Sequence, residues 1–207
     1  MTSIFVRLTT VCTIAGCTDL PDFDDPRAHE AEEAVDSCDD LLVNGDFDDG
    51  ATVGWSANAD NIIFDADTVE QIYAYSGRYF AWLGGELSVT RNLTQELSVP
   101  AGATSLRLEG KYSVAAESET GPVEDTFKIE LYNSGGMLVS TPLTLSNTTW
   151  TIGGGDDFFR WSDLVVNINT EAVAGQRAKL RLVSVNDSLN NTNFLFDSLS
   201  LRSTGCP

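Results

Sequence analysis

The sequence predicts an all-β protein, an antiparallel β-sandwich or jelly roll of about nine or ten strands. Short apolar and β-branched runs recur from Leu41 onward, and clusters of Gly, Asn, Asp and Pro separate them. No stretch beyond residue 40 shows a sustained helical stripe. Turns are expected at 100–102, 133–136, 153–157 and 186–188.

Two segments alternate clearly between apolar and polar residues. In 105–112, Leu106 and Leu108 share one face, while Arg107 and Glu109 lie on the other, and 126–131 repeats the pattern. This period of two is typical of a half-buried antiparallel strand. The other expected strands are, in chain order, 61–64, 79–83, 87–99, 137–145, 158–168, 178–185 and 193–201.

The charge of the chain excludes several functions. Its 207 residues contain 12 Lys and Arg against 31 Asp and Glu, a formal net charge of −19. Such a chain repels phosphate backbones, so we expect no nucleic-acid partner. The single histidine, His29, excludes a site of several imidazoles and leaves a Ser-His-Asp arrangement only if His29 takes part. Metals that prefer oxygen ligands, such as Ca²⁺, remain open.

The acidic charge is concentrated before the strands. Residues 18–40 contain ten of the 31 acids, a single Arg and few large apolar side chains. A segment of this composition buries too little surface to offset its ordering entropy. Residues 17–40, with His29, are therefore predicted to be a flexible, solvated tether.

Residues 1–16 have the pattern of a signal peptide. They contain one Arg and no acid, and their apolar run is too short to span a bilayer. The run ends in Ile14-Ala-Gly-Cys17, which resembles the lipobox of bacterial lipoproteins. The resemblance implies that Cys17 is acylated, and Thr18 in place of Asp implies sorting to the outer membrane. The alternative is an ordinary secretory signal that contains Cys17 by chance, which gives a secreted protein.

Two of the four cysteines are left for the folded region. Cys12 leaves with the signal peptide and Cys17 takes the lipid, so Cys38 and Cys206 remain, one at each end of the predicted domain. In an oxidising compartment a disulfide between them is the expected state. Closing so long a loop contributes at most about 5 kcal/mol in the chain-entropy model. Two free thiols are the alternative.

Several motifs in 41–207 occur in a recognisable order. They are Leu42–Asp48, Tyr75–Gly84, Val99–Leu106, Glu117–Glu119 with Asp125–Phe127, and Asn186–Leu189 with Phe194–Leu201. Together they resemble galactose-binding-like jelly rolls, including carbohydrate-binding modules that accompany secreted bacterial hydrolases. The resemblance implies one β-sandwich domain and a non-catalytic role. It is more specific for the fold than for the ligand.

The resemblance also implies a structural Ca²⁺ between the first and last strands. It assigns the ligands to Asp48, to the backbone carbonyls of Gly45 and Arg78, and to Asp197. This mixture of carboxylates and carbonyls suits Ca²⁺. Asp48 stands where the family more often has Glu, which shortens the reach of the carboxylate.

The position of Asp197 in its strand suggests that its carboxylate is buried and therefore has a partner. It has the same strand parity as Leu195, Leu199 and Leu201, so we expect it to point with an apolar set. A buried carboxylate needs a partner, and a cation is one. The alternative is that Asp48 and Asp197 are ordinary turn and strand-end carboxylates.

A second acidic group comprises Glu117, Glu119, Asp125 and Asp187. If their loops meet at one rim, they are candidates to bind sugar hydroxyls or a second cation. Otherwise they form a solvated acidic surface. Paired carboxylates also serve glycoside hydrolysis, but nothing else in the chain marks a hydrolase.

Exposed aromatic rings are the usual platform for sugars on a β-sandwich. Trp150 follows a loop-like Ser-Asn-Thr-Thr stretch and is the first candidate, whereas Trp82 is expected in the core. Trp55, Phe158, Phe159 and Trp161 are weaker candidates.

These observations predict a non-catalytic cell-surface lipoprotein, tethered to the membrane only by its lipid. Its domain, residues 41–207, is expected to bind a polysaccharide or cell-surface glycan and to contain a structural Ca²⁺. The alternative is a structural or protein-interaction module of a bacterial surface assembly, without a sugar ligand.

Overall fold

The computed structural model describes residues 39–50, 53–68, 72–117, 122–149 and 160–204. All of them belong to one compact unit, Val35–Pro207. The predicted signal peptide, most of the predicted tether and several candidate residues lie outside the described ranges. These residues are Cys17, His29, Cys38, Glu119, Trp150, Phe158, Phe159 and Cys206.

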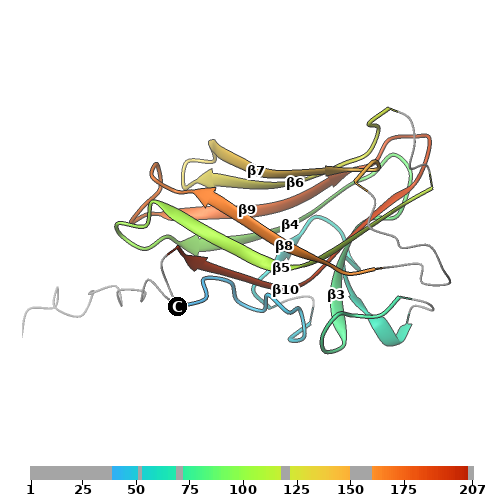
Figure 1. The fold of residues 1–207 in the computed structure, drawn as a ribbon, viewed down its shortest axis with the longest axis horizontal. Helices are drawn as coiled ribbons and strands as arrows, with labels where there is room; N and C mark the ends of the chain where they lie inside the picture. The colour runs from blue at the N-terminus through green and yellow to red at the C-terminus, as the bar shows by residue number, and fades with distance from the viewer. Residues whose placement is uncertain (1–38, 51–52, 69–71, 118–121, 150–159, 205–207) are drawn as a thin grey trace, which may run out of the picture. The chain divides into compact units, whose positions relative to one another are not determined.

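Two antiparallel five-stranded sheets pack face to face, which confirms the predicted all-β sandwich (Figure 1). Sheet A has the order β1-β4-β9-β6-β7, formed by Ser56–Ala57, Thr90–Ser98, Arg177–Val185, Thr126–Asn133 and Leu138–Ser146. Sheet B has the order β2-β3-β10-β5-β8, formed by Ile63–Asp65, Tyr79–Gly84, Thr192–Ser203, Ser105–Ala116 and Ser162–Asn169. A single 3₁₀ turn, Ala66–Thr68, follows β2.

The core lies between the two sheets. The rings of Phe127 on β6 and Phe196 on β10 stack across it with centroids 4.2 Å apart, and neither side chain is exposed. Burying rings of this size removes a large apolar surface from water and so stabilises the sandwich. The alternate apolar residues predicted in β5 and β6, including Leu106, Leu108 and Ile129, all lie in this core.

The outer faces of the two sheets differ. On sheet B, Ile72 packs on Phe80 and Leu195, so the segment before β3 covers part of the sheet. On sheet A, the outward side chains of the central strand β9 include Arg177 and Lys179, which are exposed. The open face of the sandwich, among the described residues, is therefore the outer face of sheet A.

A bulge in β10 changes which residues face the core. The pairing of β10 with β5 shifts register between Asp197 and Ser200, and Ser198 has a positive φ of 52°. Leu195 lies in the small cluster on the outer face of sheet B, whereas Leu199 and Leu201 lie in the main core. We expected Leu199 and Leu201 to point to the same face of the sheet as Asp197. This expectation is wrong, because the extra residue in the bulge inverts the alternation beyond it.

No helix in the described ranges is long and apolar enough to cross a membrane.

Candidate functional site

The candidate site lies on the outer face of sheet A, over strands β4, β9 and β6. Along β9, Ala178, Leu180 and Leu182 are buried in the core, so the residues between them point outward. The strand registers place outward residues in rows across the sheet. One row is Thr94, Arg181 and Glu130, and the next is Glu96, Lys179 and Tyr132.

Arg181 is the centre of a small polar network on this face. Its Nη1 donates to the Tyr132 hydroxyl at 3.4 Å, and that hydroxyl donates to Glu130 Oε2 at 2.7 Å. Arg181 Nε lies 3.8 Å from the same Glu130 oxygen, within range of an ion pair but too far for a hydrogen bond. The Glu130 carboxylate raises the pKa of Tyr132 by accepting a hydrogen bond from its hydroxyl, so this hydroxyl stays protonated at neutral pH.

Two adjoining hollows form a groove across these strands. The first, about 680 Å³, lies over β1, β4 and β9, and the second, about 410 Å³, lies over β9 and the turn between β6 and β7. Both are lined by Glu96, Lys179 and Arg181. Asn92 and Thr94 line the first hollow, and Tyr132 lines the second. The groove thus offers amide, hydroxyl, cationic and anionic groups beside one aromatic ring.

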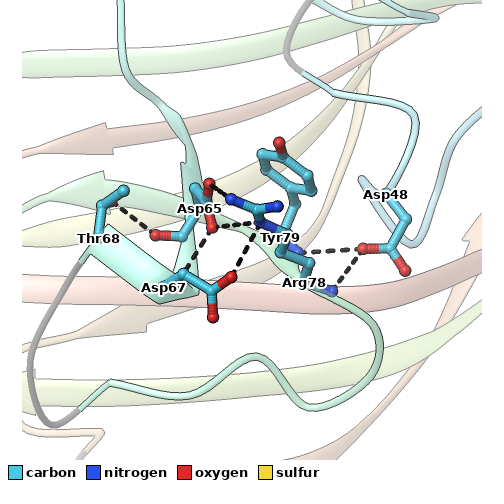
Figure 2. A network of polar contacts seen from close by, with 6 residues as sticks. All are labelled: Asp48, Asp65, Asp67, Thr68, Arg78 and Tyr79. Atoms are coloured by element: carbon cyan, nitrogen blue, oxygen red, sulfur yellow. Dashed lines mark hydrogen bonds and ion pairs between the residues drawn. The ribbon is translucent and has the colours of Figure 1, made fainter.

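Asp48, a predicted calcium ligand, binds the turn before β3. Its Oδ1 accepts from the backbone N–H groups of Arg78, at 2.7 Å, and Tyr79, at 3.0 Å (Figure 2). The Arg78 side chain extends away from Asp48 and pairs with Asp65 and Asp67. The hydrogen bond that the Arg78 guanidinium donates to Asp65 is the main cause that lowers the pKa of this carboxyl group.

Asp197 binds the same turn from β10. Its Oδ2 accepts from the backbone N–H groups of Tyr75, at 2.7 Å, and Ser76, at 3.1 Å, and its Oδ1 accepts from Ser198. The side chain is fully buried. Burial raises the pKa of Asp197 to about 6, although the three backbone N–H groups oppose the shift.

The four predicted calcium ligands lie on three segments, 45–48, 75–79 and 197–199, whose hydrogen bonds to one another form one junction. The Gly45 carbonyl accepts from Leu199 N–H at 2.8 Å, next to Asp197, and the Arg78 carbonyl accepts from Ala66 N–H at 2.9 Å. Every predicted ligand oxygen group thus has a backbone donor, and the described residues contain no cluster of three metal-binding side chains. Each carboxylate and carbonyl retains further lone pairs, so the donor set is of the type that Ca²⁺ uses.

The second acidic group gathers at the loop that follows β9. Asp125, which is buried, accepts from Asp187 N–H at 2.7 Å, and Glu117 accepts from Asn191 N–H at 3.1 Å. Asp187 itself accepts from Leu189 N–H at 2.8 Å. The three described acids therefore lie around one loop, and all three bind its backbone. This loop lies at the opposite end of β9 from Arg177 and Lys179.

The described tryptophans are largely part of the protein's own packing. Trp55, one of the weaker candidates for an exposed ring, is buried against Phe47 and donates to the Asn44 carbonyl, so it cannot serve as a sugar platform. Trp82 packs on the outer face of sheet B, beside Phe80, rather than in the main core. Trp161 is half-buried and donates to the Tyr73 carbonyl.

The residues of the groove were not singled out from the sequence. The sequence did contain a signal for this face. Three basic residues, Arg177, Lys179 and Arg181, occupy alternate positions, the first just before the predicted strand at 178–185 and the other two within it. In an acidic chain this pattern marks a solvent-exposed face. Nothing in the sequence marked Tyr132 in the same way. It directly follows the alternating segment 126–131, where an aromatic residue is readily explained by packing in the protein.

No protein-family model matches the chain, and no curated protein matches its sequence. Solved structures match its fold. The carbohydrate-binding module TmCBM61, in complex with beta-1,4-galactotriose, is 19% identical with a TM-score of 0.51, and the match covers 80% of this chain and 99% of that one. Family 16 Carbohydrate Binding Module-2 is 19% identical with a TM-score of 0.51, covering 78% and 98%.

An apo form cyclase from Fischerella sp. has the same fold, with 16% identity and a TM-score of 0.52 over 81% of this chain and 97% of the cyclase. At these identities the likeness shows the fold alone. The comparisons confirm the resemblance to carbohydrate-binding modules at the level of a β-sandwich. They also show that this architecture carries an enzyme, so the ligand must be argued from the site.

Proposed function

We propose that this protein is a non-catalytic carbohydrate-binding module and that the groove on the outer face of sheet A binds the sugar. The observation that carries the proposal is the groove itself, which is concave and lined by donors and acceptors on three neighbouring strands. The fold shared with carbohydrate-binding modules supports it.

The chemistry of the groove suits sugar hydroxyls, which both donate and accept hydrogen bonds. Asn92 and Thr94 offer both functions, Lys179 and Arg181 donate, and Glu96 accepts. The ring of Tyr132 adds apolar surface at one end. These side chains stand on hydrogen-bonded strands, so their positions are set before a ligand arrives.

We further propose that Ca²⁺ is structural in this domain and binds at the junction described above. Asp48 and Asp197 would supply carboxylate oxygens, and Gly45 and Arg78 would supply carbonyls. The cation would add electrostatic linkage between the first and last parts of the domain. The buried carboxylate of Asp197, which no side-chain cation pairs among the described residues, supports this assignment.

The proposal also includes the signal peptide, the lipid anchor, the tether and the disulfide that the sequence predicts. Residues 1–16 would be removed, Cys17 acylated, and the acidic tether would separate the domain from the outer membrane. Cys38 and Cys206 would form a disulfide. Mass spectrometry of the protein purified from membranes tests both features, because each predicts a definite mass. An unmodified Cys17 in a secreted product would contradict the anchor.

A glycan array with the full chain, with and without Ca²⁺, tests the function. Asn92→Ala, in the groove, should weaken binding at least about fivefold. Asn167→Ala, an exposed residue of β8 on the other sheet, should not change it. Glu117→Gln tests the acidic rim in the same format. Absence of binding across a wide array would contradict the sugar-binding role.

A further inference from the structure

We propose that the groove on sheet A selects an acidic glycan and that sugar carboxylates pair with Arg181 and Lys179. This inference rests on the proposed function and specifies the class of its ligand. It depends on the distribution of charge over the fold and on the unused hydrogen-bonding capacity of Arg181.

The outer face of sheet A has a charge opposite to that of the chain. Four of the chain's 12 Lys and Arg point outward from its strands, whereas the outward acids on β4, β9 and β6 are Glu96 and Glu130. The four basic residues are Lys128, Arg177, Lys179 and Arg181. The chain as a whole carries 31 acids against those 12 bases. Charges more than about 8 Å away are largely screened in physiological salt, so a ligand in the groove experiences mainly this local excess.

Arg181 is held in place by its neighbours, but several of its N–H donors have no hydrogen-bond partner among the described residues. Its side-chain polar contacts with the described residues are the 3.4 Å bond to the Tyr132 hydroxyl and the 3.8 Å approach to Glu130. Its Nε is shielded from solvent and has no hydrogen-bond partner among the described residues. A guanidinium has five N–H donors. Glu130 and Tyr132 thus fix the plane of the guanidinium while the remaining N–H donors of its two Nη atoms stay available, and a planar carboxylate fits such a fork in a bidentate manner.

The cations beside Arg181 are equally available. Lys179 is exposed and makes no ion pair with any described residue. The ion pair of Arg177 with Glu96 spans 3.9 Å between side chains that are about 70% exposed, and such a pair contributes little. The three basic residues alternate along β9, so successive Cα atoms lie about 7 Å apart on one face. A chain of acidic sugars lying along β9 would meet several cations in succession.

The experiment compares one sugar backbone with and without its charge. Polygalacturonate, the same polymer after methyl esterification, and dextran sulfate are titrated into the full chain by calorimetry, each with and without chelator, because Ca²⁺ can crosslink the polymer but is also proposed to stabilise the domain. Polygalacturonate should bind at least about tenfold more tightly than the methyl ester. It should also bind more tightly than dextran sulfate, because the planar fork matches carboxylates. Its affinity should fall as salt rises.

Substitutions locate the effect. Lys179→Gln should weaken binding of polygalacturonate about fivefold, and Arg181→Gln should weaken it at least about tenfold. Arg181→Lys retains the charge without the fork and should recover only part of the loss. Arg202→Gln makes the same charge change on an exposed residue of β10 and should leave affinity unchanged. Since the Lys179 side chain makes no ion pair or hydrogen bond with the described residues, its variant remains informative even if Arg181→Gln fails to fold.

The possible outcomes distinguish a failure of the acidic-ligand inference from a failure of the proposed sugar-binding function. Neutral glycans bound on the array, with equal affinity for polygalacturonate and its methyl ester, would overturn the acidic ligand and leave sugar binding intact. Dextran sulfate bound as tightly as polygalacturonate would overturn the assignment to carboxylate. Failure to bind any glycan would overturn both.

Discussion

The Asp197 carboxylate and the backbone N–H of Tyr75 are 122 positions apart in the chain and hydrogen-bonded at 2.7 Å. Asp48 binds the other end of the same turn through Arg78 and Tyr79. One short turn before β3 is therefore held by a residue from the start of the domain and by one from its last strand. The stability of the sandwich should depend strongly on these two carboxylates, whether or not a cation adds to them.

Removing the Asp197 carboxylate should destabilise the domain. In Asp197→Ala the backbone N–H groups of Tyr75, Ser76 and Ser198 lose their acceptor, so the free energy of unfolding should fall by about 2–3 kcal/mol. Urea denaturation measures this change. Glu171→Ala, an exposed residue without an ion pair among the described residues, is the control and should change stability by less than about 0.5 kcal/mol. Equal effects of the two substitutions would contradict the role of the junction.

The pH dependence of stability should carry the signature of Asp197. In chelator, burial raises the folded-state pKa from 3.8 to about 6, so the folded state binds more protons than the unfolded state between these values. Stability should therefore fall as pH rises from about 4 to 7, by up to about 3 kcal/mol. Asp197→Asn does not titrate, and the difference between its unfolding curves and those of the unaltered protein isolates this contribution. A difference that does not vary with pH would show that the carboxylate ionises normally.

Removal of Ca²⁺ should lower the melting temperature if the cation binds at the junction. Chelator is expected to reduce the melting temperature of the unaltered protein, because a ligand that binds only the folded state stabilises it. Asp197→Ala should abolish this response. Saturating Ca²⁺ should also remove the pH dependence described above, since a bound cation favours the ionised carboxylate. A melting curve that ignores chelator would contradict the calcium proposal while leaving the sugar groove untouched.

Gly77 should tolerate no side chain. It has a φ of +60°, and a Cβ there would overlap the Asp48 carboxylate. Gly77→Ala should therefore cost at least about 3 kcal/mol, from the left-handed backbone and from the hydrogen bonds that Asp48 gives up. Gly136→Ala is a matched control, because Gly136 has a φ of +78° with nothing within 4 Å of its Cβ position. It should cost only about 1–2 kcal/mol. Thermal unfolding of the two variants compares them directly.

The strands were largely predictable because burial imposes a period of two. Strands β5, β6 and β9 form where apolar residues alternate with polar ones, with bounds within a few residues of the prediction. β1 was not predicted, since two residues, Ser56–Ala57, are too few to show a period. The bulge after Asp197 was also beyond the sequence, because its leucines alternate as if the strand were regular.

The candidate site was less predictable than the fold. The sequence pointed to acids and tryptophans as residue types, but a groove depends on which strands become neighbours. Thr94, Arg181 and Glu130 come from three segments that meet only once β4, β9 and β6 pair. The family resemblance assigned Asp48 and Asp197 to one calcium site, and in the structure both bind the backbone of the turn at 75–79. Their hydrogen-bond partners depend on the backbone of the turn, which side-chain patterns do not encode.

The alternation of β9 separates two tasks within nine residues. Ala178, Leu180 and Leu182 hold the sandwich together, while Arg177, Lys179 and Arg181 meet the solvent. Under the proposed function, a substitution at 177 or 179 should therefore alter recognition at almost no cost to folding. Side chains on the central strand alone would then set whether the groove takes neutral, acidic or basic ligands, which would suit this face to the design of glycan binders.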